Sequence, residues 1–139
     1  MSSEAIFSKL LKKHMPIEAH WQRIETGSTG TGIPDVNVCH LGQDIWIELK
    51  LVKGRKVDLS PTQVAWLTKR SRVGGVTWIM ARHTYDGPKI GKGDAIYLWP
   101  GSMAKSVLRD GIKCRLGVRE WSAPFDWPYI IEVLFKQEE

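Results

Sequence analysis

The chain has 139 residues, of which 42% are hydrophobic and 25% charged, with a formal net charge of +5. These values are typical of a globular protein that buries its own core, and no apolar run approaches the roughly 18 residues of a membrane span. Cys39 and Cys114 form no CxxC pair and the four histidines are scattered, which argues against structural zinc. The length predicts one domain, residues 1–139. The first residues lack the apolar segment of a signal peptide, so we expect the protein in the cytoplasm or, if it is viral, in the host cytoplasm.

The chain opens with a predicted amphipathic helix. Residues 2–13, SSEAIFSKLLKK, begin with a serine cap, and Ile6, Leu10 and Leu11 lie near one face at helical spacing. Glu4 falls in the first turn, where a carboxylate suits the positive end of the helix dipole. These residues therefore predict a helix packed on a core.

A second helix has clear boundaries. Ser60 has the chemistry of an N-cap, Pro61 takes the first helical position, and Gly74 with Gly75 ends the helix. The other predicted elements are strands at 19–26, 35–41, 45–50, 76–82 and 94–100, helices at 102–111 and 125–139, a glycine-rich loop at 27–34, a basic loop at 52–59 and a flexible loop at 83–93, with a hairpin turn at Gly42 and Gln43. Their order predicts an α/β fold, a mixed central β-sheet flanked by helices.

The positive charge is concentrated in one segment. Residues 50–72 carry seven basic side chains and one acidic side chain, whereas residues 1–49 carry four and six. A local basic cluster favours a polyanion such as nucleic acid. Charge alone fits a solvated lysine-rich surface equally well.

The strand pair 35–41 and 45–50 carries charged residues among apolar ones. Side chains alternate across a strand, so Trp46, Glu48 and Lys50 share the face opposite the apolar residues, with the Cα atoms of Glu48 and Lys50 about 6.5–7 Å apart. If the strands form a hairpin, Asp35 lies opposite the end of the second strand. The two carboxylates and the lysine can then converge at one end of the hairpin.

Two neighbouring carboxylates are suited to a hard divalent cation. Mg²⁺ takes oxygen ligands and keeps several waters, and it can activate water beside a scissile phosphate. Lys50 could orient that water or stabilise charge on phosphorus. The alternative is an exposed strand face with a Glu48–Lys50 pair, which contributes at most about 1 kcal/mol.

The sequence resembles a known nuclease superfamily in three linked motifs. GIPD at 32–35, IELK at 47–50 and LSPTQ at 59–63 are similar to the PD-(D/E)xK nucleases, and more narrowly to the VRR-NUC family. Archaeal-type Holliday junction resolvases show a related pattern. The resemblance covers about residues 2–82 and leaves residues 83–139 without a motif. It implies a restriction-endonuclease-like core.

The resemblance also implies roles for individual residues. Asp35 and Glu48 would ligate Mg²⁺, with Mn²⁺ able to substitute, the Leu49 carbonyl is a candidate third ligand, and Lys50 would be the catalytic lysine. Gln63 would lie close to the site, although a capping box with Ser60 explains it as well. The family usually adds an acid from the first helix, for which the candidates are Glu4, then Glu18 and Glu25.

Several further residues are candidates for DNA contact. Trp46 could shape the site, stack on an unpaired base or pack under a helix, and Lys89 and Lys92 could contact phosphate. The predicted DNA-binding set is Lys53, Arg55, Lys56, Lys69, Arg70, Arg72, Ser28 and Thr29.

These observations favour a Mg²⁺-dependent DNA endonuclease. The resemblance implies structure-selective cutting of Holliday junctions, flaps or other branched DNA in replication, recombination or repair. Because a junction needs two symmetric cuts, we expect a homodimer. The alternatives are a non-catalytic nucleic-acid-binding module that keeps the fold, and a metal enzyme acting on phosphorylated metabolites, which leaves the basic cluster unexplained.

Overall fold

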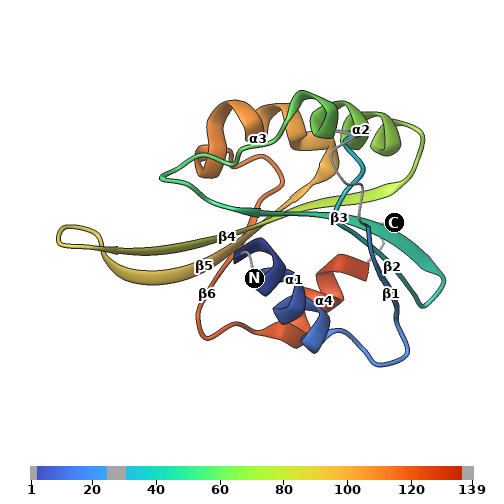
Figure 1. Cartoon of the computed structure of the whole chain (residues 1–139), viewed down its shortest axis with the longest axis horizontal. Coiled ribbons are helices and arrows are strands. Elements are labelled where there is room, and N and C mark those ends of the chain that lie inside the picture. The colour runs from blue at the N-terminus through green and yellow to red at the C-terminus, as the bar shows by residue number, and fades with distance from the viewer. Residues whose placement is uncertain (1–2, 25–30, 136–139) are drawn as a thin grey trace.

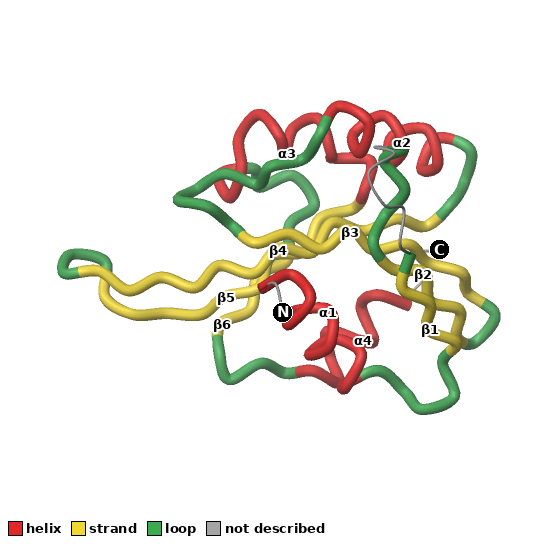
Figure 2. Tube along the Cα trace, in the orientation of Figure 1, coloured by secondary structure: helices red, strands yellow, loops and turns green. Residues whose placement is uncertain are grey.

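A computed structural model describes residues 3–24 and 31–135 of the chain. Figures 1 and 2 show three layers: a twisted sheet in the middle, helices α2 (Pro61–Arg72) and α3 (Ala104–Asp110) on one face, and helices α1 (Ser3–His14) and α4 (Trp127–Phe135) on the other. The predicted α/β class, with a mixed sheet flanked by helices, is confirmed.

The sheet of the described residues has six strands in chain order, β1 to β6. The β3–β4 pair is parallel and is connected through α2, whereas the other neighbouring strands are antiparallel. The strands are β1 (His20–Arg23), β2 (Val36–His40), β3 (Gln43–Leu51), β4 (Val76–Gly87), β5 (Gly91–Pro100) and β6 (Arg119–Ser122).

Each face of the sheet carries its own apolar core. The core under α1 and α4 contains Phe7 and Leu11 of α1 and the inward residues of β2 and β3. The core under α2 and α3 contains Leu67 of α2, Val107 of α3 and the opposite face of β4 and β5. Helices cover both faces of the sheet, so the middle of β3, from Ile47 to Leu49, is buried on both sides.

The first helix is in the predicted place, but its buried face differs from the predicted one. Phe7 and Leu11 are fully buried, whereas Ile6 is 49% exposed. Phe7 and Leu11 are four residues apart and define the stripe that meets the sheet. The prediction that Ile6 lies on this face was therefore wrong.

The hairpin turn lies one residue earlier than predicted. His40 pairs with Gln43, so Leu41 and Gly42 form a two-residue turn. Both have positive φ, 52° and 75°. A type I′ turn requires this geometry at both positions, and it matches the twist of the flanking strands.

The predicted flexible loop at 83–93 is mostly strand. β4 continues to Gly87, β5 starts at Gly91, and the two strands pair from Trp78 with Pro100 to Gly87 with Gly91. The sequence prediction gave weight to Gly and Pro and overlooked that only the residues between the two strands need to turn. Residues 119–122, which were assigned to no element, form the edge strand β6.

The helix α2 begins as predicted. Ser60 is the N-cap, Pro61 opens the helix, and Ser60 with Gln63 forms a complete capping box. The helix predicted at 102–111 is α3, but Met103 stands at its N-cap without a side-chain hydrogen bond. Within the part of the chain described, no helix has the length and apolar character to cross a membrane.

Candidate metal-binding site

The candidate site lies where β2 begins and β3 nears its end. The paired residues Val36 and Ile47 fix the register, and one step further along it Asp35 faces Glu48. Because successive residues alternate between faces, Asp35 shares a face with Glu48, the one opposite Val36 and Ile47. The hairpin thus brings together two carboxylates that are 13 positions apart.

The two faces of β3 differ as the alternation predicts. Ile45, Ile47 and Leu49 are buried in the core under α1 and α4. Glu48 and Lys50 lie on the other face, toward α2. The charged residues of this strand therefore occupy the side where a helix N-terminus can supply donors.

Asp35 is held by its backbone and by its side chain. Its carbonyl accepts a hydrogen bond from the Ile24 amide at 2.7 Å, and its Oδ2 accepts one from the Leu49 amide at 2.9 Å. The N–H and C=O of a strand residue project toward the same neighbouring strand. The Leu49 carbonyl therefore also projects toward the β2 side of β3.

Glu48 is buried without full hydrogen bonding. Its side chain is 1% exposed, Oε1 accepts a hydrogen bond from Gln63 Nε2 at 2.8 Å, and Oε2 has no donor among the described residues. An ionised acid in this position is costly, because it has lost water and gained no positive partner in contact. A proton or a cation would satisfy Oε2.

The surroundings of Glu48 raise its pKa from 4.5 to about 9. Burial is the largest cause, and the negative charge of Asp35 adds to it. Lys50 acts in the opposite direction by favouring the charged form. Without a cation Glu48 therefore keeps its proton at neutral pH.

Gln63 combines the two roles that the sequence suggested. Its Oε1 accepts from the Ser60 amide at 2.9 Å, and its backbone amide donates to Ser60 Oγ at 3.2 Å. The capping box therefore fixes the side chain, and the free Nε2 reaches Glu48. The start of α2 is thereby tied to the candidate site.

Gly32 places the GIPD segment against the same helix start. Its φ is +80°, and a Cβ there would overlap the Thr62 carbonyl and crowd the Gln63 amide. Only glycine combines this backbone conformation with so close an approach. The contact packs the GIPD segment against the SPTQ segment at the start of α2.

The structure describes two of the three candidates for the third acid. Glu4, on the first turn of α1, is exposed, yet its charge raises the pKa of Glu48. Glu18 is exposed between α1 and β1, and Glu25 lies outside the described residues. The described residues hold no group of three or more His, Cys, Asp or Glu side chains able to bind a metal.

An aromatic cluster borders the site on α2. The Trp46 and Trp66 rings lie 5.2 Å apart, and the Arg70 guanidinium is 5.4 Å and 4.5 Å from their respective centroids. Trp46 therefore packs under a helix, with its Nε1 buried and unpaired among the described residues. Trp66 had no predicted role, although Gln63, Trp66 and Arg70 lie on one helical face by their spacing.

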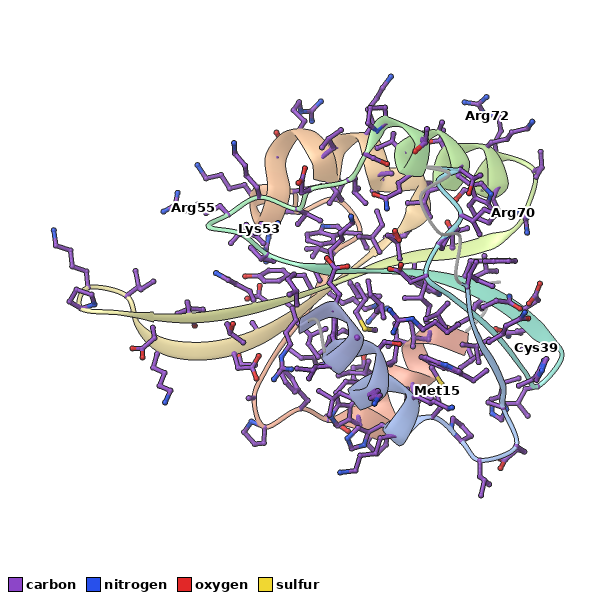
Figure 3. The ribbon with its side chains drawn as sticks, viewed as in Figure 1. Met15, Cys39, Lys53, Arg55, Arg70 and Arg72 are labelled. Carbon is purple, nitrogen blue, oxygen red and sulfur yellow. The ribbon has the colours of Figure 1, made fainter. Side chains whose placement is uncertain are left out.

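The predicted DNA-binding residues fall into two groups. Lys53 and Arg55 lie on the loop between β3 and α2, whereas Arg70 and Arg72 lie at the far end of α2 (Figure 3). Arg70 is half-buried against the tryptophans, so it is the least available to a ligand. Lys56 belongs to the first group and exposed Lys69 to the second, and Ser28 and Thr29 lie outside the described residues.

Comparison with known proteins finds a likeness among solved structures alone. Neither a known protein family nor a curated protein matches the chain. Among solved structures, the chain is similar to Hjc of Archaeoglobus fulgidus, a Holliday junction resolvase from an archaeal hyperthermophile. The identity is 17%, the match covers 94% of this chain and 96% of that chain, and the TM-score is 0.48.

Proposed function

We propose that this protein is a divalent-metal-dependent DNA endonuclease that hydrolyses phosphodiester bonds. The observation that carries the proposal is the pair Asp35 and Glu48, with Glu48 Oε2 buried and without a donor among the described residues. Buried acids placed side by side are destabilising unless a cation uses them. Perturbed acids of this kind cluster at functional sites.

The donor set suits Mg²⁺ or Mn²⁺. Asp35, Glu48 and the Leu49 carbonyl offer oxygen atoms from one end of the hairpin, and Mg²⁺ takes few protein ligands while it keeps several waters. When bound, such an ion lowers the pKa of a bound water and neutralises charge on a phosphate. Glu4 is the candidate to add a ligand through water.

The other side chains of the site support this chemistry. Lys50 lies on the same strand face two residues beyond Glu48, where its ammonium group can hold the attacking water or stabilise charge on phosphorus. Gln63 fixes the orientation of the Glu48 carboxylate through the 2.8 Å hydrogen bond. For Glu48 to act as a ligand, it must release the proton that it keeps in the free protein.

The nucleic acid substrate is supported by charge and by the resemblance of the motifs. The exposed cations on the β3–α2 loop and at the end of α2 lie on the helical layer that borders the site. The GIPD, IELK and LSPTQ motifs resemble those of nucleases that act on branched DNA in replication, recombination or repair. We extend the proposal to branched DNA and to a homodimer that places two sites on one junction.

A second candidate is a nucleic-acid-binding module that keeps the fold without catalysis. The observation in its favour is that the described residues form no three-ligand metal group. The retained Asp35, Glu48 and Lys50 favour the nuclease. Cleavage assays separate the two.

The proposal is tested with supercoiled plasmid and with labelled four-way, flap and linear DNA in Mg²⁺, Mn²⁺ or EDTA. We expect cleavage only with a divalent metal, and its loss in Asp35→Ala and in Lys50→Ala. Asp44→Ala is the matched control, because Asp44 is an exposed acid near the turn of the same hairpin.

Each outcome is informative. Absence of metal-dependent cutting on every substrate would reject the nuclease, and binding without cutting would favour the second candidate. Cutting that survives both substitutions would place the active site elsewhere. Preference for four-way DNA over linear duplex would support the branched substrate.

A further inference from the structure

The outer half of the β4–β5 hairpin, residues 82–94, projects beyond both helical layers. The core residues of β4 end at Ala81 and those of β5 begin at Ala95. Figures 1 and 2 show this segment, here called the arm, extending past the helices. A two-stranded ribbon is marginally stable in water unless something packs against it.

The base of the arm is held firmly. Arg82 forms two hydrogen bonds to the Asp94 carboxylate, at 3.0 Å and 2.8 Å, across the two strands. On the opposite face the Tyr85 ring lies over Gly93, where a Cβ would overlap the ring. The arm is therefore a formed element that carries an aromatic ring on a fixed support.

The aromatic face of the arm continues the face of the candidate site. Glu48 pairs with Ile79 and Lys50 with Ala81 in the parallel register. By alternation His83 and Tyr85 follow on that same face of β4, with their rings 4.9 Å apart. The Tyr85 ring is half-buried, with Gly93 against one side and the His83 ring beside it.

Positive charge lies near these rings. Lys89 and Lys92 are exposed at the tip, Lys92 on the face opposite Tyr85 and paired across the strands with Asp86, the one acidic residue of segment 83–93. The loop with Lys53, Arg55 and Lys56 joins the base of the arm through the Val52 amide and the Arg82 carbonyl, 2.9 Å apart (Figure 3). Asp94 is neutralised by Arg82.

We propose that the arm binds an unpaired DNA strand next to the candidate site, with Tyr85 stacking on a base and Lys89 and Lys92 contacting phosphates. This inference rests on the proposed function and narrows its substrate to DNA with a single-stranded segment. An aromatic ring on one face of the arm and basic side chains at its tip suit an unpaired strand, because every base has a face to stack. A second copy of this chain, with the same excess of positive charge, fits less well.

The test measures the binding of fluorescent DNA in EDTA, where no metal-dependent cleavage occurs. A splayed-arm duplex with unpaired ends is compared with a blunt duplex of equal phosphate number. Tyr85→Val keeps a strand-forming residue and removes the ring, whereas Tyr85→Phe keeps the ring. Lys89→Gln/Lys92→Gln is matched by Lys12→Gln/Lys13→Gln, on the last turn of α1 on the other side of the sheet.

We expect Tyr85→Val to weaken binding of the splayed duplex about tenfold or more, and Tyr85→Phe to bind as the wild type does. Removal of both tip lysines should reduce the slope of log affinity against log salt by about 1.5, and the α1 control should not. Equal loss on the blunt duplex would exclude stacking.

Three outcomes overturn the inference in different ways. If the wild type binds and the arm variants bind equally well, the arm inference fails and the proposed function stands. If the wild type binds no DNA, both fail. If the arm variants alter only the oligomeric state in light scattering, the arm is a contact between copies.

Discussion

The two β-hairpins of this protein treat a carboxylate in opposite ways. Glu48, on the β2–β3 hairpin, lies beneath α2, is 1% exposed and has another acid beside it. Asp94, on the β4–β5 hairpin, is 26% exposed and is paired with Arg82 in a two-point contact. Among the described residues Glu48 Oε2 has no partner, whereas Asp94 is paired with the cation of Arg82.

The difference shows how structural and functional acids can be separated. A paired carboxylate at the surface contributes little and requires nothing more. A buried carboxylate next to a like charge destabilises the free protein and is retained where a ligand uses it. The comparison predicts that changes at Glu48 affect activity most and changes at Asp94 least.

The largest expected effect is that of Glu48→Gln. The amide keeps the shape but removes a metal ligand, so we expect cleavage to fall about a thousandfold, as loss of several kcal/mol of charge stabilisation implies. The metal-free variant should melt several degrees higher than the wild type at pH 8, because Glu48 must take up a proton on folding at this pH and the amide need not. Gel assays and thermal unfolding measure both. A variant that is active, or less stable at this pH, would contradict the assignment.

The second largest expected effect is a pH dependence of stability that comes from Glu48 on the β2–β3 hairpin. The pKa of Glu48 is about 9 when folded against an ordinary 4.5, so between these values the folded state holds a proton that the unfolded state has lost. Stability without metal should therefore fall as pH rises from 4.5 to 9. Because Mg²⁺ replaces the proton, the stabilisation by Mg²⁺ should grow over this range.

Unfolding at pH 5, 7 and 9, with Mg²⁺ and with EDTA, checks this expectation. Glu48→Gln is the control, and its stability should lack the added fall with pH. Parallel curves for the two proteins would show that Glu48 does not titrate in this range.

A smaller effect separates the two roles of Gln63. Ser60→Ala removes the cap and should cost about 1 kcal/mol of stability, with cleavage within about threefold of the wild type. Gln63→Leu removes both the cap partner and the donor to Glu48. It should therefore lower stability by about 1 kcal/mol more than Ser60→Ala does, and lower the cleavage rate about tenfold. Denaturant unfolding and initial rates test the pair. Equal cleavage rates for Ser60→Ala and Gln63→Leu would show that Gln63 acts only in the capping box.

The smallest expected effect is that of Asp94→Asn. The partly exposed pair with Arg82 contributes about 1 kcal/mol, and this contribution should shrink in high salt. Denaturant unfolding at two salt concentrations measures it. A loss comparable to that of a buried pair would mean that the arm base is part of the core. Asp110→Asn, at the exposed Arg109–Asp110 pair, is the matched control.

Much of the fold followed from local signals. The capping chemistry of Ser60, Pro61 and Gln63 correctly predicted α2, because capping is decided within one helical turn. The arm was mistaken for a loop, because a run of Gly, Pro and Lys resembles a turn until its partner strand is known. The buried face of α1 was predicted wrongly at Ile6. Ile6 and Phe7 are both apolar, and which of them is buried depends on how the helix packs on the sheet.

The sequence by itself determined that Asp35, Glu48 and Lys50 share one end of a hairpin, because strand alternation and a two-residue turn are local rules. Only the tertiary structure decided that Glu48 is buried and unpaired, that Gln63 reaches it, and that the basic residues divide into two groups. Those outcomes depend on which helix covers which face of the sheet. Burial, and with it the pKa of an acid, is a property of distant residues packed together.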